Sequence, residues 1–341
     1  MTRGRGARAA TARAGMRPAS APDDGAFADA VIDWQKTHGR HALPWQGTRD
    51  PYRVWLSEVM LQQTQVETVR AYYERFLGRF PDVAALAAAP LSEVLALWSG
   101  LGYYSRARNL HRCAETVMSQ HGGAFPRTAA ELAQLPGIGR STAGAIAAFC
   151  FGERAAIMDG NVRRVLARVL AFDGDLAQTA AMKRLWQHAE ELLPRNRLAQ
   201  SIPRYTQGMM DLGAGICTQR NPACLLCPVQ SHCAAFSAGR VTDFPVRTRK
   251  LKRSSEALWL LYARAADGAI WLAERPTPGV WAGLHCFPAF ESFPALAAAV
   301  PARYRERLLE QPPVVHILTH KTLHLHPVFV EMSGTPILRC V

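Results

Sequence analysis

Four cysteines in the second half of the chain are spaced so that their thiolates can close around one metal centre. They follow the pattern C-x6-C-x2-C-x5-C and are Cys217, Cys224, Cys227 and Cys233. Four cysteine thiolates bind either structural zinc or an iron–sulfur cluster, and the spacing alone leaves both open. Six basic residues follow at 240–253, so a metal-ordered loop would lie beside cations that can bind phosphates.

A second motif is a Gly-x-Gly turn that opens onto a helix of small residues, LPGIGRSTAGAI at 135–146. The two glycines permit a tight turn, and the backbone N–H groups of the turn and of the helix start can bind one phosphate. An ordinary helix–helix turn is the alternative. The residues predicted to contact the DNA backbone here are Pro136, Gly137, Gly139 and Ser141.

The composition narrows the class of partner. The chain has 341 residues, about half of them apolar, and a net charge of +13, which favours a polyanion such as nucleic acid over an inert basic surface. Only four of the eight cysteines cluster, as expected in a reducing compartment rather than in a disulfide framework. No apolar run approaches the ~20 residues that span a bilayer. We therefore expect a monomeric, cytoplasmic, nucleoid-associated protein without membrane contact.

The glycine turn followed by the cysteine cluster resembles the endonuclease III superfamily of DNA base-excision enzymes. Three further stretches resemble the adenine DNA glycosylases (the MutY family): WLSEVMLQQTQV at 55–66, GLGYY at 100–104 and MDGNV at 158–162. The resemblance covers about residue 26 to at least residue 290. It implies a [4Fe–4S] cluster rather than zinc. It also implies a double-stranded DNA substrate with adenine opposite 8-oxoguanine or guanine, from which adenine is removed to leave an abasic site.

Two carboxyl groups fit that chemistry. Cleavage of an N-glycosidic bond needs a proton for the leaving base and a negative charge beside the oxocarbenium sugar. Glu58 lies between apolar neighbours that would raise its pKa and keep it protonated as the general acid. Asp159 precedes a predicted helix whose N–H groups would keep it ionised. The resemblance adds Asn161 as a hydrogen-bonding support. The alternatives are a solvated helix face for Glu58 and a plain N-cap for Asp159.

An adenine inside a duplex must be flipped out before it can reach two carboxyl groups. The resemblance assigns contacts with the vacated stack and the lesion to Gln63, Thr64 and Tyr103, and it places Trp45 and Gln207 in the adenine pocket. Tyr103 could instead be a half-buried aromatic, and Trp45 a core residue.

The C-terminal part has a different pattern. Apolar runs at 257–262 and 269–273 flank Asp267-Gly268, which predicts a β-hairpin, and 295–309 is predicted to be helical. This part resembles the Nudix-like (MutT-like) domain of the same family, but the glutamate-rich helix that binds magnesium in that domain is missing. It should therefore read DNA rather than hydrolyse nucleotides.

In the resembled family a Phe-Ser-His loop recognises 8-oxoguanine, and here the matching residues are Leu318-Thr319-His320. We expect Thr319 and His320 to make these contacts, since the threonine keeps the hydroxyl group. The chain ends at Val341, earlier than the resemblance would suggest.

The predicted fold is multidomain, with an all-α helix-hairpin-helix glycosylase core that carries the Fe–S loop and a C-terminal α+β Nudix-like domain. The segments are a disordered basic tail at 1–25, for which a transit peptide is the alternative, the helical core at 26–236, a basic linker at 237–255 and the Nudix-like domain at 256–341. Within the core we expect a six-helix hairpin module at about 47–156 and an Fe–S module of 26–46 plus 157–236.

Two rival functions are kept. One is a bifunctional glycosylase/lyase of the endonuclease III type, although Ser141 stands where such relatives carry a Schiff-base lysine. The other is a non-enzymatic Fe–S protein that binds DNA as a redox regulator, which would need neither Glu58 nor Asp159.

Overall fold

The computed structural model describes residues 24–248, 253–276 and 278–333. Most of the predicted tail and three linker cations, Arg249, Lys250 and Lys252, lie outside the described residues. Tertiary contacts divide the chain into two compact units, which are Met1–Ala88 with Asn109–Thr248, and Ala89–Arg108 with Arg249–Val341. None of the described helices is long and apolar enough to cross a membrane.

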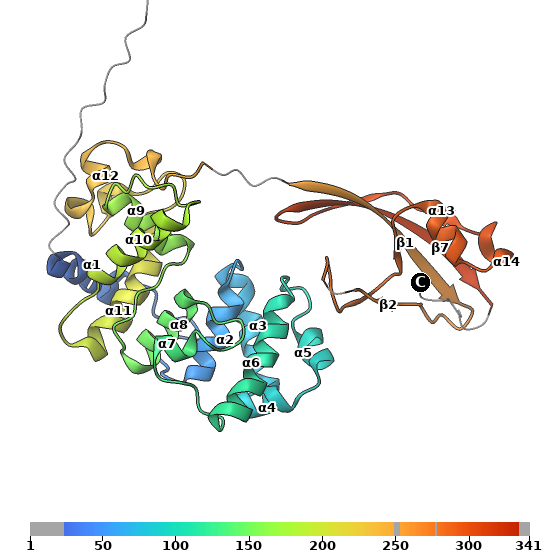
Figure 1. Ribbon diagram of the computed structural model, residues 1–341, viewed down its shortest axis with the longest axis horizontal. Helices are drawn as coiled ribbons and strands as arrows, with labels where there is room; N and C mark the ends of the chain where they lie inside the picture. Colours follow the sequence, from blue (N-terminus) through green and yellow to red (C-terminus); the bar gives the residue numbers. More distant parts are fainter. Residues whose placement is uncertain (1–23, 249–252, 277, 334–341) are drawn as a thin grey trace, which may run out of the picture. The chain divides into compact units, whose positions relative to one another are not determined.

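The first unit is helical and contains two groups of helices (Figure 1). One group comprises α1 (Asp24–His38), α9 (Gly160–Val169), α10 (Thr179–Glu191), α11 (Leu198–Asp211) and α12 (Ala234–Ser237). The other comprises α2 (Pro51–Leu61), α3 (Val66–Arg79), α4 (Val83–Ala88), α6 (Ser105–His121), α7 (Ala129–Leu132) and α8 (Arg140–Ile146).

Short irregular helices connect the groups and form the cysteine loop. Two π-helices, η1 (Ala147–Phe151) and η2 (Leu212–Ile216), continue α8 and α11 directly. Three 3₁₀ turns follow, η3 (Cys224–Leu226), η4 (Gln230–His232) and η5 (Val241–Asp243). π-Turns of this kind are rare and are often found beside functional sites. Here η1 ends the helix that follows the glycine turn, and η2 leads into Cys217, the first cysteine of the cluster motif.

Local sequence explains where the key helices begin. Asp50 caps α2 by accepting a 2.9 Å hydrogen bond from the N–H of Tyr52, and Pro51 occupies the first helical position. Val54, Trp55 and Leu56 are buried, so the core of this unit surrounds most of the circumference of α2. Burial of such large side chains contributes about 1.5–3 kcal/mol each. This packing fixes the rotation of α2 and hence the direction of its remaining side chains.

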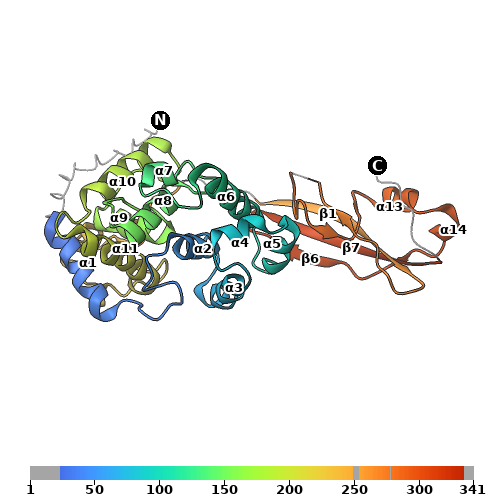
Figure 2. The ribbon, with the colours of Figure 1, turned by 90° about the horizontal axis from the view of Figure 1, so that it is seen from below.

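The second unit is built on a mixed sheet with the strand order β4-β1-β7-β5, in which β6 also pairs with β7. The longest pairing is parallel and runs from Ser254↔Lys321 to Ala265↔Met332. Figure 2 shows β1, β6 and β7 side by side. The strands are β1 (Ser254–Ala265), β2 (Ala273–Glu274), β3 (His285–Cys286), β4 (Ala289–Phe290), β5 (Leu309–Glu310), β6 (Val314–Ile317) and β7 (Lys321–Met332).

Two helices, α13 (Phe293–Ala299) and α14 (Ala302–Arg305), pack against this sheet around the buried Leu261, Leu296 and Val328. The unit also includes α5 (Leu91–Leu97) and the loop that follows it. The single helix predicted at 295–309 is therefore wrong in detail. It is interrupted at Pro301, whose ring cannot continue a helix, and its end is the strand β5.

The predicted hairpin at Asp267-Gly268 is present and short. Gly268 has a φ of +86°, and the N–H of Ala269 donates to the Asp267 carboxylate at 2.9 Å. The second run pairs with the end of β1 through the antiparallel bridge between Arg264 and Ile270 and two flanking backbone hydrogen bonds, and further on β2 pairs with β3. The parallel partner β7 occupies one side of β1, a long-range pairing that a local pattern cannot reveal.

Candidate active site

Glu58 lies on α2 between the buried residues Ser57 and Val59, and its own side chain is only partly exposed. Burial, and after it the negative charge of Asp159, raise the pKa of Glu58 from 4.5 to about 7. No hydrogen bond to its carboxyl group comes from the residues that the structure describes. Glu58 is therefore a carboxyl group that can hold a proton near neutral pH and can donate it to a bound molecule.

Asp159 is the N-cap of α9, where its Oδ1 accepts a 2.7 Å hydrogen bond from the N–H of Val162. Burial raises its pKa, while the N–H groups of Val162 and Asn161 and the charges of Arg164 and Arg163 oppose that rise. The expectation that helix N–H groups decide the state of Asp159 thus left out its burial.

The distribution of charge between the two carboxyl groups follows from their partners. Four groups favour the charged form of Asp159, whereas Glu58 has burial and a like charge against its own charged form. Two interacting carboxyl groups titrate as a pair, and the proton resides where ionisation is least favoured. When the pair holds one proton, these partners favour the proton on Glu58 and the negative charge on Asp159.

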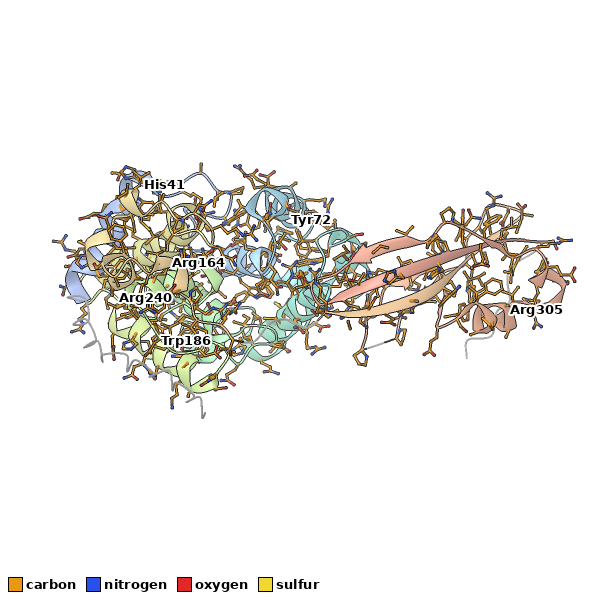
Figure 3. The ribbon with its side chains drawn as sticks, turned by 90° about the horizontal axis from the view of Figure 1, so that it is seen from above. His41, Tyr72, Arg164, Trp186, Arg240 and Arg305 are labelled. Carbon is orange, nitrogen blue, oxygen red and sulfur yellow. The ribbon has the colours of Figure 1, made fainter. Side chains whose placement is uncertain are left out.

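Arg164 fixes the start of α9 to the segment that leads into the cysteine loop (labelled in Figure 3). Its Nη2 donates to the Oδ1 of Asn161 at 2.9 Å and to the carbonyl of Gly213 at 2.6 Å, and its Nε donates to the carbonyl of Cys217 at 2.7 Å. A Cβ on Gly213 would come within 2.6 Å of the Asn161 Cβ, so this close approach requires glycine. Asn161 thus supports the local backbone.

The helix after the glycine turn, α8, contacts both elements that carry the carboxyl groups. The N–H of Met158, next to Asp159, donates to the Ser141 hydroxyl at 2.9 Å. At the end of α2, the amide of Gln62 donates to the hydroxyl of Thr142 at 3.3 Å. Two adjacent hydroxyl groups on α8 therefore connect it to the end of α2, the helix that carries Glu58, and to the residue before Asp159.

The glycine turn has the predicted local geometry. Gly137 has a φ of +76°, and a Cβ there would approach the Cβ of Asn109 to 2.6 Å. Gly139 is the N-cap of α8 and no side chain caps it, while Pro136 lies in the turn itself. Both glycines are exposed. Their contact with DNA stays a prediction.

Of the two residues predicted for the adenine pocket, Gln207 belongs to a hydrogen-bonded network around Asp211. Asp211 is buried and accepts from the backbone N–H and the Nε of Arg40, at 2.9 and 2.6 Å, and from the amide of Gln207 at 2.9 Å. The amide of Gln46 donates to the Arg40 carbonyl at 2.9 Å. Trp45 is buried and packs edge-on against Tyr73, as its core alternative would have it.

The sequence did not predict that Asp211 and Arg40 belong to this network. Asp211 follows Gln207 by one helical turn, so the two side chains share a face of α11, and that spacing was the available signal. Arg40 lies far away in the sequence, and only the fold brings it to Asp211.

Two predicted DNA contacts, Gln63 and Thr64, follow the end of α2. Gln63 is exposed with a φ of +58°, a rare value for a residue other than glycine. The N–H of Thr64 donates to the Leu61 carbonyl at 3.4 Å. Backbone strain of this kind is concentrated at functional sites, where the surrounding structure maintains it.

In the second unit, Tyr103 and Thr319 lie together. The Tyr103 hydroxyl is 2.5 Å from the Thr319 Oγ1, and both side chains are exposed. Tyr103 has a φ of +48°, and Arg106 stacks over its ring with 5.5 Å from Cζ to the ring centre. Thr319 and His320 form the turn between β6 and β7, where the N–H of Leu318 donates to the Lys321 carbonyl at 2.8 Å. Predicted contacts from distant parts of the sequence therefore meet.

The four cysteines line one small cavity. The buried Arg168 donates from Nη1 to the Cys217 Sγ at 3.3 Å and to the Thr218 carbonyl at 2.7 Å. Burial is the largest cause that raises the pKa of Cys227 to about 11, and the neighbouring cysteines raise it further. The described residues include no group of three Cys, His, Asp or Glu arranged to hold a single metal ion. Four thiols around one cavity, with a buried arginine beside them, are a donor set that can hold a thiolate-bound metal centre.

Known proteins match both units. Residues 56–191 match the HhH-GPD superfamily of base excision DNA repair proteins, and residues 259–339 match the NUDIX domain. The adenine DNA glycosylase of Buchnera aphidicola from Baizongia pistaciae is 36% identical over 314 residues, 90% of this chain and 86% of the relative. The human adenine DNA glycosylase is 36% identical over 92% of this chain and 68% of its own length.

The chain belongs to the adenine DNA glycosylase family. It is a DNA glycosylase that removes adenine in base excision repair. The fold predicted from the sequence, a helical helix-hairpin-helix core with a C-terminal Nudix-like domain, is confirmed. A solved structure of a thermostable thymine-DNA glycosylase is 28% identical with a TM-score of 0.54, over 62% of this chain and 95% of that chain. The individual site residues and the mismatch specificity stay predictions.

The Asp211 network predicts a stability effect. Asp211→Ala should lower the free energy of unfolding by about 2–4 kcal/mol, because a buried acceptor of three hydrogen bonds is lost and Arg40 keeps an unpaired charge that is partly exposed. The control is Asp33→Ala, which removes an exposed ion pair with Lys36 and should cost at most about 1 kcal/mol. Denaturant titration of both variants measures this. Equal effects would show that Asp211 does not anchor this region.

Proposed function

We propose that the chain removes adenine paired with 8-oxoguanine, and adenine paired with guanine, with Glu58 as the general acid and Asp159 as the counter-charge of the sugar. The observation that carries this proposal is the pairing of a protonation-prone Glu58 with a hydrogen-bonded Asp159 in one frame. Asn161 supports the site through its bond to Arg164.

The chemistry follows from these two groups. The Glu58 carboxyl donates its proton to a ring nitrogen of the flipped adenine, so that the bond between the base and the C1′ of deoxyribose can break with its electron pair on the base. The Asp159 carboxylate stabilises the positive sugar or bonds to it. Water then adds to C1′, and where Asp159 has bonded there, the bond between its oxygen and C1′ breaks and the carboxylate is released. The proton of the water passes to the Glu58 carboxylate, and an abasic site remains.

Ser141 supports release without strand cleavage. Its hydroxyl accepts the N–H of Met158, and the position offers no amine for a Schiff base. The direct assay uses a duplex with adenine opposite 8-oxoguanine and compares strand cleavage with and without added alkali. We expect breaks only after alkali. Breaks without alkali would favour the bifunctional alternative, and no abasic site in either sample would refute the proposal.

The raised pKa of Glu58 predicts how the rate of adenine excision depends on pH. Its folded pKa of about 7 means that the active, protonated form predominates below that pH and is lost above it. Nearby DNA charge favours the protonated form, so the fall begins at or above about pH 7 and then approaches tenfold per pH unit. Glu58→Gln should reduce the single-turnover rate by about 10²–10⁴-fold and remove this fall. Glu67→Gln, on an exposed face of α3, is the control. A wild-type rate independent of pH would remove Glu58 from this role.

We propose that Cys217, Cys224, Cys227 and Cys233 hold a [4Fe–4S] cluster. The support is that all four thiols line one cavity beside a buried arginine, together with the family resemblance. When bound, the cluster supplies four iron–sulfur bonds that order the loop. Arg168 contributes a positive charge next to the thiolates and donates to two loop carbonyls.

The metal content of the purified protein tests whether the four cysteines hold an iron–sulfur cluster or zinc. Anaerobically purified protein should be yellow-brown and contain about four irons per chain. Cys227→Ser should lose iron and unfold at a lower temperature, whereas Cys113→Ser, at a buried cysteine outside the cavity, should keep its iron. One zinc and no iron in the parent protein would contradict this assignment.

Recognition of the opposite base is proposed for Thr319 and His320, with Tyr103 beside them. The Tyr103 hydroxyl and the Thr319 hydroxyl share a hydrogen bond at an exposed turn, so one of them remains available to a base edge. We propose that the space left by the flipped adenine is filled by Gln63 and Thr64. The adenine pocket is proposed to contain Trp45 and Gln207. The DNA backbone is proposed to contact the glycine turn at Pro136, Gly137 and Gly139.

Loss of the loop contacts should reduce discrimination. Thr319→Ala combined with His320→Ala should narrow the preference for 8-oxoguanine over guanine by about 1–3 kcal/mol, while adenine removal continues. The measurement is the ratio of single-turnover rates and affinities on the two duplexes. Thr242→Ala, at an exposed position in the first unit, is the control. An unchanged ratio would assign recognition to other residues.

A further inference from the structure

The loop that carries Tyr103 has an unusual backbone. Three of its residues have a positive φ, Gly100 at +92°, Gly102 at +74° and Tyr103 at +48°. Glycine adopts this conformation freely, but in tyrosine it brings Cβ close to the following carbonyl oxygen and costs free energy. The Tyr103 hydroxyl contacts Thr319, but both side chains are exposed and water can replace that bond. Other contacts must therefore hold Tyr103 in this conformation.

Arg106, in the first turn of α6, contacts both the backbone of this loop and the Tyr103 ring. Its Nη2 donates to the carbonyls of Leu101 and Gly102 at 3.2 and 3.1 Å. Its backbone N–H donates to the Tyr103 carbonyl at 2.8 Å. Its Cζ lies 5.5 Å from the centre of the Tyr103 ring, within the range of a cation–π contact. One residue therefore restrains the loop backbone and the ring that the loop presents.

Arg106 is in turn fixed by a buried aromatic side chain. The Trp98 ring is fully buried, and the Arg106 Cζ lies 5.3 Å from its centre. The Trp98 Nε1 donates at 3.1 Å to the Gly102 carbonyl, the same oxygen that accepts from Arg106. Arg106 is itself buried, which lowers its pKa to about 10, so the guanidinium stays charged at neutral pH. Within the second unit, the support thus runs from a buried ring through a buried cation to an exposed ring.

We propose that Arg106 is a positioning residue, which holds the Tyr103 ring ready to contact DNA beside the opposite base. The inference rests on the proposed role of Tyr103. A side chain that is fixed before binding loses little conformational freedom when it meets DNA, so more of the contact free energy appears as affinity. An apolar side chain could fill the space of Arg106 without the cost of burying a charge. It could not, however, bind two carbonyls and the face of a ring at once.

The first test examines Tyr103 in the protein without DNA. The full-length chain is labelled with fluorotyrosine, and the fluorine NMR line of Tyr103 is assigned by its loss in Tyr103→Phe. We expect Arg106→Gln to change the relaxation rate of this line, because a ring released from its cation samples other orientations. Loss of a nearby charge alone would shift the line and leave its relaxation unchanged, and that result would overturn the proposal.

The matched control for this test is Arg108→Gln, two residues later on α6. The Nη1 of Arg108 donates to the Ala282 carbonyl at 2.7 Å. This variant removes a guanidinium from the same helix, and the relaxation of the Tyr103 line should stay as in the parent chain.

The second test is a double-variant cycle on DNA binding. The ligand is a duplex with a tetrahydrofuran abasic analogue opposite 8-oxoguanine, so no excision takes place. We expect Arg106→Gln to weaken binding about tenfold in the parent chain and less than about twofold in Tyr103→Ala, because the arginine acts through that ring. Equal losses in both backgrounds would show that Arg106 acts independently of Tyr103, which would also overturn the proposal.

Failure of this inference can be told apart from failure of the proposed function. If Tyr103→Ala binds this duplex as tightly as the parent chain, the proposed DNA contact of Tyr103 is refuted, and the inference fails with it. Weaker binding by Tyr103→Ala, combined with equal losses from Arg106→Gln, refutes the inference alone. Circular dichroism and melting temperature confirm that each variant is folded. If Arg106→Gln does not fold, Arg106→Lys replaces it in both tests with the same expected direction, because lysine keeps the charge but lacks the planar fork.

Discussion

The proposed mechanism depends on one proton shared unequally between two carboxyl groups. Glu58 and Asp159 are close enough that each charge affects the other, so both ionise together only at a cost. The fold resolves this by giving the N–H groups and cations to Asp159 and leaving Glu58 without them. A single site can then offer an acid for the departing base and a negative charge for the sugar it leaves.

The different surroundings of Glu58 and Asp159 require segments that are distant in the sequence to be held together. Two hydroxyl groups of α8 hold the end of α2 and the residue before Asp159. Arg164 ties Asn161 to the backbone at Gly213 and Cys217. One helix turn further on, Arg168 donates to the Cys217 sulfur and to two loop carbonyls, and also to the carbonyls of Val241 and Phe244. Successive turns of α9 therefore connect Asp159 with the cysteine loop, and order in that loop supports the geometry of the proposed site.

Features that local sequence determines were predictable. The cap at Asp159, the positive φ at Gly137 and the turn at Gly268 each follow from residue type, and the structure has all three. Contacts between distant segments were not predictable. The Arg40–Asp211 ion pair and the parallel β1–β7 pairing depend on how the whole chain packs. Burial is another such property, which is why the raised pKa of Asp159 was missed while that of Glu58, signalled by its apolar neighbours, was anticipated.

The most direct test of the central claim is the single-turnover rate of Asp159→Asn on a duplex with adenine opposite 8-oxoguanine. Asparagine caps a helix about as well as aspartate, so α9 and the free energy of unfolding should be nearly unchanged. The negative charge beside the sugar is lost, and we predict that excision slows about 10²-fold or more. A folded variant that excises adenine at the parent rate would show that Asp159 is only a helix cap and would contradict this account.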